Sequence, residues 1–480
     1  MRIVARHRLG LVALALLSGM ASLSAPSLAD QRTANAASGD KEYRLILPVV
    51  YGGSNNVRVP TGNSIPVPTP APQSTSVPLG AYSRLGVWTG PADDAMLTSL
   101  QQAGAQWTRF HLDWATIEPN YTDPATYDFT EYDNYLAASG RAGMTAIVEI
   151  RGNPSWAAAT RCGPIGRIDR FAEFLRTLVN RYRIPPYNVK HWEFFNEPDN
   201  KKASSSEFVG GCFGDQPGGY VEVLRVAYTV IKAVDPEAKI VLGGLAFDQW
   251  SDPTFGPVFN TEFLDQILAL GAGAYFDVAN VHYYSSQTTR WSTYGKDLLG
   301  KVAAFREVMA RHNTTKPVVV TETNWTSGPG SSGDILEQQA RYVPKVLARG
   351  LAANLYAVYW FMLKEWPGAD YPYGLVDLDL KPRPAYHAYQ VAADEFGRAA
   401  TIRPLSPSEL GVAGGIEGYA FDVDGQVRWV LWADDGVVVN VRLPETAAQA
   451  HDKQGQSISL ADHGQTTIAL DDSPIYVRFR

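Results

Sequence analysis

Short apolar runs alternate with amphipathic stretches over most of this chain, and this alternation limits the possible folds more than any other feature. Eight runs have strand character, namely Leu85–Trp88, Trp107–Leu112, Thr145–Ile150, Val189–Phe195, Lys239–Gly244, Phe276–Tyr284, Pro317–Glu322 and Tyr356–Phe361. Stretches with helical periodicity lie between several of them, namely Ile168–Arg181, Tyr220–Val234, Asp297–His312 and Ile335–Arg349. Eight strand–helix units predict a parallel sheet closed into a (β/α)8 TIM barrel, here over residues 81–398.

An open, doubly wound sheet is the alternative that the same alternation allows. Such a sheet usually has a glycine-rich phosphate-binding loop after its first strand. The residues that follow the first predicted strand are Thr89-Gly90-Pro91, and they do not form such a loop. The barrel is therefore the favoured interpretation.

The pattern changes after residue 398, where short alternating runs are separated by turn signals. The runs are residues 419–423, 428–433, 437–443, 466–470 and 475–479. They predict a small antiparallel β-sandwich over residues 399–480. Asp422-x-Asp424-Gly425 also resembles the start of a calcium loop, but the other ligand positions of such a loop are missing, so a hairpin turn is favoured.

The first 29 residues have the three-part pattern of a secretory signal peptide. Arg2, Arg6 and Arg8 precede an uncharged stretch, Leu9–Ala25, and Ser27-Leu28-Ala29 supplies small residues at the expected cleavage site near Ala29. A membrane anchor is the alternative, but the uncharged stretch is interrupted by serines and is too short to span a bilayer comfortably. We therefore expect a secreted, extracellular protein with no membrane association after cleavage.

Residues 30–51 contain a short apolar run that we leave unassigned. Residues 52–80 are expected to be a linker, because they are rich in proline, and Pro66, Pro68, Pro70 and Pro72 alternate in a manner typical of an extended spacer. The whole chain has 42 basic and 49 acidic residues, a formal net charge of −7. This acidic balance gives no basic surface for nucleic acid. We expect a monomer.

The reactive side chains of a barrel lie at the carboxyl ends of its strands. The predicted strand ends carry Arg109, His111, Arg151, Asn196, Glu197, His282, Tyr284, Glu322 and Trp360. Glu197 and Glu322 are on the fourth and seventh strands, which lie roughly opposite each other. Paired carboxyl groups that face one cavity suit glycosidic bond cleavage, in which one group donates a proton and the other attacks or stabilises the oxocarbenium-like centre. Like charges that lie close together also separate the two pKa values.

These strand ends resemble those of a known group of enzymes. Trp192–Pro198 (WEFFNEP) is similar to the fourth-strand Asn-Glu-Pro signature of the retaining (β/α)8 glycoside hydrolases called clan A. Val319-Val320-Thr321-Glu322 is similar to the clan's seventh-strand nucleophile motif, and His282-x-Tyr284 and Trp360 also fit. The resemblance covers the whole predicted barrel, and the trailing β-domain matches a common accessory of the clan.

The resemblance implies a role for each matching residue. Glu197 would be the general acid/base and Glu322 the nucleophile. Asn196 would hold the sugar 2-hydroxyl. Tyr284 would hydrogen-bond the nucleophile, and Arg109 would keep it ionised. His282 would lie near the acid/base and help to set its proton. The alternative for each is a structural role, such as a salt-bridged carboxylate or a core histidine. Glu193 is interpreted as a deeper barrel residue, and Glu149 and Arg151 as a supporting pair.

Half of the twelve tryptophans fall at or just after predicted strand ends: Trp88, Trp114, Trp156, Trp325, Trp360 and Trp366. Aromatic faces stack on sugar rings, so these residues are candidate substrate platforms, with ordinary packing as the alternative. Trp156, Trp325 and Trp360 are the preferred candidates. The clan's eighth-strand tryptophan lies beneath the sugar at the cleavage point, so the resemblance assigns that role to Trp360.

The two cysteines, Cys162 and Cys212, lie in the loops after the third and fourth predicted strands. Both loops belong to the same rim, and an exported protein favours disulfides, so we expect a bridge between them. Two free buried thiols are the alternative.

The substrate stays open among β-linked glucans, xylans, mannans and similar poly- or oligosaccharides. Thr321–Trp325 resembles glycoside hydrolase family 39, which includes xylosidases and iduronidases. A non-catalytic carbohydrate-binding barrel and a transglycosylase that uses the same residues are the alternatives to a hydrolase. No His-x-His or His-Glu-x-x-His pair occurs among the eight histidines, so neither a metal nor a cofactor is expected.

Overall fold

The computed structural model describes residues 82–201, 212–249, 251–252, 256–326, 334–369, 371–460 and 466–480. The expected signal peptide, the unassigned segment 30–51 and the linker over residues 52–80 all lie outside the described residues. Within the described part of the chain, no helix combines the length and the apolar character needed to cross a membrane.

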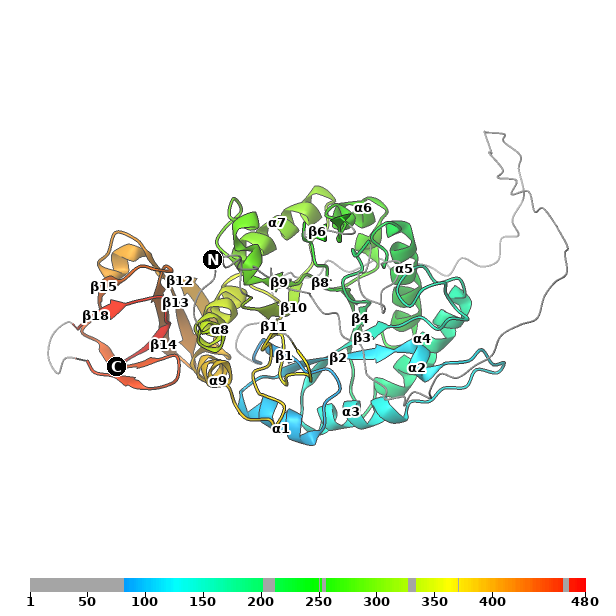
Figure 1. Ribbon diagram of the computed structural model, residues 1–480, viewed down its shortest axis with the longest axis horizontal. Helices are drawn as coiled ribbons and strands as arrows, with labels where there is room; N and C mark the ends of the chain where they lie inside the picture. Colours follow the sequence, from blue (N-terminus) through cyan, green and yellow to red (C-terminus); the bar gives the residue numbers. More distant parts are fainter. Residues whose placement is uncertain are drawn as a thin grey trace, which may run out of the picture. The chain divides into compact units, whose positions relative to one another are not determined.

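Parallel strands form a barrel, as the sequence predicted (Figure 1). In chain order these strands are β1 (Leu85–Trp88), β2 (Trp107–Asp113), β3 (Thr145–Arg151), β4 (His191–Phe194), β5 (Lys239–Leu242), β8 (Ala279–Asn280), β9 (Tyr283–Tyr284), β10 (Val318–Asn324) and β11 (Val358–Trp360). The hydrogen-bonded order is β5-β4-β3-β2-β1-β11-β10-β8, and β9 also pairs with β10. Parallel bridges Val241↔Val278 and Leu245↔Val281 join the two edges and close the barrel.

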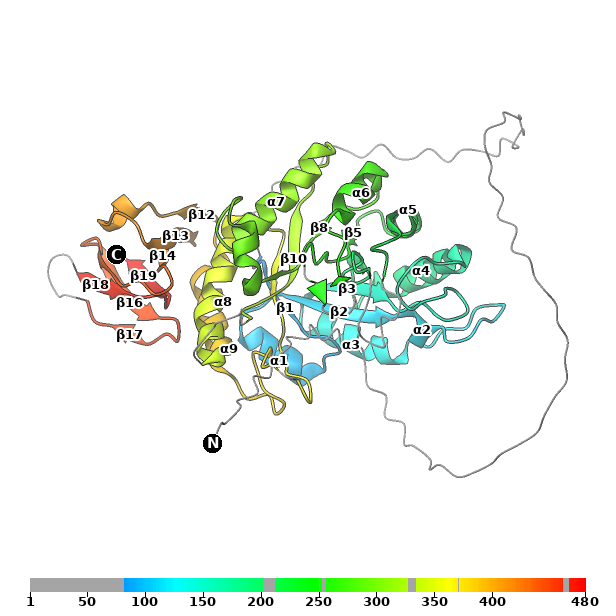
Figure 2. The same cartoon turned by 45° about the horizontal axis from the view of Figure 1, so that its top comes forward.

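Helices surround the strands, as Figures 1 and 2 show. They are α1 (Asp94–Gln102), α2 (Trp114–Ile117), α3 (Thr130–Arg141), α4 (Ile168–Tyr182), α5 (Pro217–Val234), α6 (Phe263–Ala269), α7 (Leu298–Arg311), α8 (Ile335–Ala352) and α9 (Pro384–Phe396). The predicted helical stretches match α4, α5, α7 and α8. In α4, Phe171, Phe174, Leu175 and Leu178 are buried, and their i, i+3, i+4, i+7 spacing explains why this stretch forms a helix packed on the sheet.

Side chains from the strands fill the barrel interior in layers, because every second side chain of a strand points to the same side. One layer is apolar and contains Ile147, Val241, Val278 and Val319 in a separate buried cluster. Two residues further along β3, Glu149 lies in a charged layer that also contains Arg109 and Glu193. The polar site therefore rests on an apolar base.

The C-terminal residues form a two-sheet β-domain, which confirms the predicted sandwich. Its strands are β12 (Thr401–Pro404), β13 (Ile416–Val423), β14 (Gln426–Ala433), β15 (Val439–Arg442), β16 (Ala447–Asp452), β17 (Ser457–Ile458), β18 (Thr467–Leu470) and β19 (Ile475–Phe479). The larger sheet has the order β12-β13-β14-β19-β16-β17, and β15 pairs with β18. Leu431 and Val477 from the first sheet share one buried cluster with Val441 and Leu470 from the second.

The turn at Asp422–Gly425, where the sequence left a calcium loop as an alternative, is a β-hairpin. Val423 pairs with Gln426 in the β13–β14 ladder, and the backbone N–H of Gly425 donates to Asp422 Oδ1 at 2.9 Å. Asp424 and Gly425 both have positive φ angles, as a tight hairpin turn requires.

The remaining elements are short. They are β6 (Ser251–Asp252), β7 (Gly256–Pro257) and the 3-10 helices η2 (Ala272–Ala274), η3 (Ser285–Trp291) and η4 (Pro407–Leu410).

Candidate active site

The structure brings together the predicted polar residues from four parts of the barrel: β2, the end of β4, the segment at β9, and β10. These residues are Arg109, Asn196, Glu197, His282, Tyr284 and Glu322, and each is less than 9% exposed. The site they form combines two carboxyl groups, one guanidinium, one imidazole, one phenol and one amide.

Arg109 is the hub of this cluster. Its guanidinium donates two hydrogen bonds of 2.8 Å to the carboxylate of Glu193, one of 2.8 Å to Glu322 Oε1 and one of 3.0 Å to Asn196 Oδ1. Glu149 Oε2 lies 3.3 Å from the same guanidinium, and its other oxygen lies 3.9 Å from Arg151. Three carboxylates around one fully buried cation hold the Arg109 side chain in a single position.

Glu322 is held from two sides. Arg109 donates to Oε1, and the Tyr284 hydroxyl donates to Oε2 at 2.8 Å. Burial raises the pKa of Glu322, while the positive charge of Arg109 and the hydrogen bond from Tyr284 lower it. Both contacts favour the ionised form of this carboxyl group.

A β-bulge in β10 allows adjacent residues to reach this cluster. Val320 is opposite Val358 and Thr323 is opposite Trp360, so β10 has one extra residue between these two pairings. Side chains at consecutive positions of a regular strand point to opposite faces, and a bulge interrupts that alternation. Thr321 and Glu322 can therefore both contact residues of the site.

Glu197 lies in an unusual turn directly after β4. Phe195 and Glu197 have φ angles of 60° and 43°, in the left-handed region that non-glycine residues rarely adopt. The turn is held by a 3.0 Å hydrogen bond from the Glu197 N–H to the carbonyl of Gly244. A residue with a side chain does not fit at position 244, because a Cβ atom on Gly244 would lie 2.0 Å from His282 Nε2.

The two oxygens of the Glu197 carboxyl group differ in their contacts. Oε1 lies 3.1 Å from His282 Nδ1. Oε2 is buried and has no hydrogen-bond partner among the described residues. An unsatisfied buried polar atom is costly, so it is a reason to expect a ligand group at this position. Burial raises the pKa of Glu197 well above its ordinary value, and the negative charges of Glu322 and Asp199 raise it further.

His282 connects Glu197 to a short chain of hydrogen bonds. Its Nε2 lies 3.1 Å from Thr321 Oγ1, and the Thr321 hydroxyl donates to Asn280 Oδ1 at 3.0 Å. Burial lowers the pKa of His282 well below its ordinary value, and the positive charges of Arg109 and Lys301 lower it further. His282 is therefore neutral, with one ring nitrogen as donor and the other as acceptor.

Asp199 and Lys301 are members of the site environment that sequence reasoning missed. Asp199 accepts hydrogen bonds from the backbone N–H groups of Ala246 and Phe247 at 3.1 and 2.8 Å. Lys301 Nζ donates to the Ala246 carbonyl at 2.6 Å, and burial lowers its pKa to about 7 although Asp199 and Glu197 raise it.

A sequence signal for Lys301 did exist. Leu298, Lys301, Val302 and Phe305 follow the i, i+3, i+4, i+7 spacing of a buried helix face, and all four are buried. A lysine among three apolar residues on such a face indicates a buried charge with a specific partner.

The structure places the candidate tryptophans in different environments. Trp114 and Trp360 are at most 1% exposed, and Trp88 is buried as well. Trp156 and Trp325 are half-buried, as is Trp366, so part of each ring is accessible. Trp156 packs edge-on against the ring of Trp114.

The predicted disulfide between Cys162 and Cys212 is confirmed, with Cα atoms 4.6 Å apart. Its position supports the turn that contains Glu197. The Cys212 N–H donates to the carbonyl of Asn200 at 2.9 Å, and the Asn200 N–H donates to the carbonyl of Glu197 at 3.0 Å. The bridge therefore connects the loop after β3 to the segment that follows Glu197.

Comparison with known proteins establishes the fold. No protein-family model matches the sequence, and no curated protein matches it. Among solved structures, a family 39 glycoside hydrolase from the gut symbiont Bacteroides cellulosilyticus WH2 is similar with a TM-score of 0.62 at 20% identity, over 83% of this chain and 81% of that one.

Two further solved structures share the fold. A glucosidase from Croceicoccus marinus has a TM-score of 0.58 at 16% identity, over 85% of this chain and 98% of that one. A family 30 subfamily 8 xylanase from Clostridium acetobutylicum has a TM-score of 0.56 at 12% identity, over 84% of this chain and 98% of that one. The chain thus shares the barrel fold of these three structures, as its alternating strands and helices predicted.

Proposed function

We propose that this protein is a secreted retaining glycoside hydrolase that cleaves O-glycosidic bonds of β-linked poly- or oligosaccharides. The observation that carries the proposal is the unequal environment of two carboxyl groups in one site. Glu322 accepts hydrogen bonds from Arg109 and Tyr284, whereas Glu197 faces a neutral histidine and has one oxygen without a partner among the described residues. One group is suited to attack and the other to donate a proton.

The proton on Glu197 follows from the hydrogen-bond chain. The Thr321 hydroxyl uses its hydrogen on Asn280, so Thr321 Oγ1 accepts from His282 Nε2–H. A neutral His282 then has a lone pair on Nδ1, and the hydrogen in its 3.1 Å contact with Glu197 Oε1 comes from the carboxyl group. The raised pKa of Glu197 agrees with this assignment, and a protonated carboxylic acid is what a departing glycosidic oxygen requires.

The proposed reaction has two displacements. In the first, a Glu322 oxygen attacks the anomeric carbon, the bond to the leaving oxygen breaks, and that oxygen takes the proton of Glu197. In the second, Glu197 removes a proton from water, which attacks the anomeric carbon and releases Glu322. The separation of the two carboxyl groups is consistent with retention. Glu197 Oε1 and Glu322 Oε2 lie 3.1 and 3.6 Å from the same nitrogen of His282. They are therefore at most about 7 Å apart, compared with about 5–5.5 Å between the carboxyl groups of retaining enzymes.

Asn196 is positioned to bind the sugar. Its Oδ1 accepts from Arg109, which leaves the amide Nδ2 as the donor for a sugar hydroxyl. A contact to the 2-hydroxyl that strengthens in the transition state would contribute directly to catalysis. Among the tryptophans, Trp156 and Trp325 are the accessible candidates for stacking, and Trp360 would act from beneath the site.

The similar solved structures support this proposal, since they include a family 39 glycoside hydrolase, a glucosidase and a xylanase. The disulfide and the signal-peptide pattern both support export.

The proposal is tested by assaying the secreted form on chromogenic glycosides and on β-glucan, xylan and mannan. Glu322→Gln is expected to abolish activity, while Glu237→Gln, at a carboxyl group that is 86% exposed, is the matched control and is expected to leave activity unchanged. Glu197→Ala is expected to lose about 10²- to 10⁴-fold on substrates with poor leaving groups and far less on activated aryl glycosides.

Proton NMR of the first-formed product is expected to show retained anomeric configuration. Inversion, or full activity of Glu322→Gln, contradicts the proposed mechanism. Products longer than the substrate would identify a transglycosylase instead, and tight polysaccharide binding without any released sugar would identify a non-catalytic barrel.

A further inference from the structure

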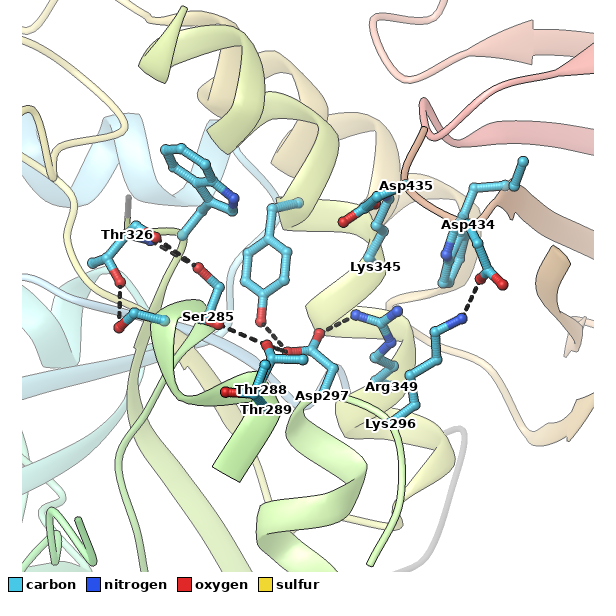
Figure 3. A pocket seen from close by; sticks show the side chains of 15 residues that line it. Ser285, Thr288, Thr289, Lys296, Asp297, Thr326, Lys345, Arg349, Asp434 and Asp435 are labelled. Carbon is cyan, nitrogen blue, oxygen red and sulfur yellow. Dashed lines mark hydrogen bonds and ion pairs between the residues drawn. The ribbon is translucent and has the colours of Figure 1, made fainter. Parts of the chain in front are cut away.

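A pocket separate from the proposed active site lies between the barrel and the C-terminal domain (Figure 3). Its volume is about 460 Å³, in the range of ligand-binding pockets. Its walls come from the start of η3, the residues after β10, the face of α8 and the turn after β14. We call it the interdomain pocket.

The interdomain pocket is close to the proposed active site along the chain. Ser285, in its wall, directly follows Tyr284, and Trp325 is three residues after Glu322. Three residues span at most about 11 Å. Ser285 Oγ accepts from the Thr326 N–H at 2.9 Å, so the two wall segments that begin at the active site are joined to each other.

The base of the pocket is a fully paired ionic network. Arg349 forms an ion pair with Asp297, donates two hydrogen bonds of 2.8 Å to Glu417 and lies over the ring of Trp432 at 5.4 Å. The Tyr342 hydroxyl donates to Asp297 at 3.0 Å. These groups join the β-domain to α8 and have little capacity left for a ligand.

Among the charged groups of the wall, Lys345 has the most hydrogen-bond donors left for a ligand. Its side chain is 8% exposed, and its ion-pair partner among the described residues is Asp435, at 3.5 Å. Asp435 is 92% exposed, so water weakens its attraction to the ammonium. An ammonium has three N–H donors, and a single distant contact leaves it able to donate to a bound molecule.

The chemistry of the wall selects an uncharged ligand with many hydroxyl groups. Three cations line the pocket together with three carboxylates, so it has no charge excess that would favour an ion: Lys296, Lys345, Arg349, Asp297, Asp434 and Asp435. Hydroxyl side chains on the opposite wall both donate and accept: Ser285, Ser286, Thr288, Thr289 and Thr326. The half-buried ring of Trp325 adds an aromatic surface.

We propose that the interdomain pocket is a distal subsite, which binds a neutral sugar residue of the substrate chain away from the bond that is cleaved. This inference rests on the proposed glycosidase function and deepens it. Sugar hydroxyls take hydrogen bonds from Lys345 and from Thr289 of η3, and they donate to the carboxylates of the turn after β14. The C-terminal domain is thereby part of the substrate-binding surface.

Isothermal titration calorimetry on the full-length Glu322→Gln protein tests the inference, with cellohexaose, xylohexaose and mannohexaose as probes. Adding Lys345→Met, which keeps the aliphatic length and removes the ammonium, is expected to weaken binding of the hexaose that binds by at least 10-fold. Adding Thr289→Ala, at an exposed position, is expected to weaken it about 3-fold and serves if the first variant does not fold. Lys381→Met, at a lysine that is 74% exposed, is the control and is expected to leave binding unchanged.

Kinetics with the active protein provide a readout that a merely structural role would not move. Lys345→Met is expected to lower kcat/KM for the hexaose at least 10-fold more than for a 4-nitrophenyl monosaccharide. Equal losses on both substrates, unchanged hexaose affinity in both pocket variants, or no binding of any hexaose overturns the inference. Hydrolysis of the aryl glycoside by the wild type reports the proposed function separately, so failure of the subsite inference is distinguished from failure of the proposed function.

Discussion

Replacing Thr321 by valine tests the hydrogen-bond chain that keeps a proton on Glu197. Valine has nearly the shape of threonine but cannot accept the hydrogen of His282 Nε2, which now lies 3.1 Å from Thr321 Oγ1. A buried donor without a partner costs about 1–3 kcal/mol. The other tautomer of His282, with the hydrogen on Nδ1, avoids this cost. In that tautomer Nδ1 donates to the Glu197 carboxylate and favours the ionised form of Glu197.

The sign and size of the effect follow from this change of tautomer. One pKa unit corresponds to about 1.4 kcal/mol, so the pKa of Glu197 is expected to fall by about one to two units. The alkaline limb of the kcat/KM profile reports ionisation of the acid in the free enzyme, so it moves to lower pH by the same amount. The assay is the pH profile on a glycoside with a poor leaving group, together with ¹⁵N NMR of the His282 tautomer.

Thr323→Val is the matched control for this experiment. Thr323 lies on the same strand and is buried, but its hydroxyl has no hydrogen-bond partner among the described residues. The substitution is expected to leave the pH profile unchanged. An unchanged alkaline limb in Thr321→Val, or a shift to higher pH, would refute the proposed direction of the hydrogen bonds.

Two further predictions concern stability. Arg109→Met leaves three buried carboxyl groups without their cation, so we expect the free energy of unfolding in urea to fall by about 3–5 kcal/mol. Arg141→Met, which breaks an exposed pair with Asp94, is expected to cost less than about 1 kcal/mol, and equal losses would contradict the argument. Folding raises the pKa of Glu197, so the folded state holds this proton more tightly than the unfolded state does. The resulting stabilisation is fully present below the unfolded pKa and is lost as the pH rises toward the folded pKa. Glu197→Gln cannot ionise, so its Tm is expected to exceed that of the wild type at pH 7 by a margin that shrinks toward pH 4; a lower Tm at pH 7 would count against the buried-acid assignment.

The barrel was predictable because its evidence is local. A strand such as Thr145–Arg151 or Val318–Asn324 is a short β-branched run, and a helix such as Ile168–Tyr182 has its own periodicity. Strands β12, β16 and β17 were not predicted. β16 has the sequence AAQAHD, which lacks a strand pattern, and it is held by pairing with β19 and β17.

The charged interior of the barrel was predictable only in part. Glu193 was placed deep in the barrel, but nothing in its neighbours along the chain indicates that both its oxygens bind Arg109, 84 residues away. Asp199 and Lys301 likewise come to share Ala246 as a hydrogen-bond partner only in the folded protein. Trp114 and Trp360 have the same strand-end position as accessible tryptophans, yet the structure buries them almost completely. Trp114 packs against Phe171 and Phe174 of α4, and Trp360 packs against Tyr342 of α8.

The sequence by itself therefore determined the fold class and the residues at the strand ends, since hydrophobic periodicity and strand-end position are properties of a local stretch of chain. Only the tertiary structure decided how Glu197 and Glu322 differ. Their proton affinities depend on burial and on charges and hydrogen-bond partners such as Arg109 and His282, which lie far away in sequence. The bulge that brings Thr321 to His282 is also a property of strand pairing. The interdomain pocket exists only where residues from the barrel and the β-domain meet.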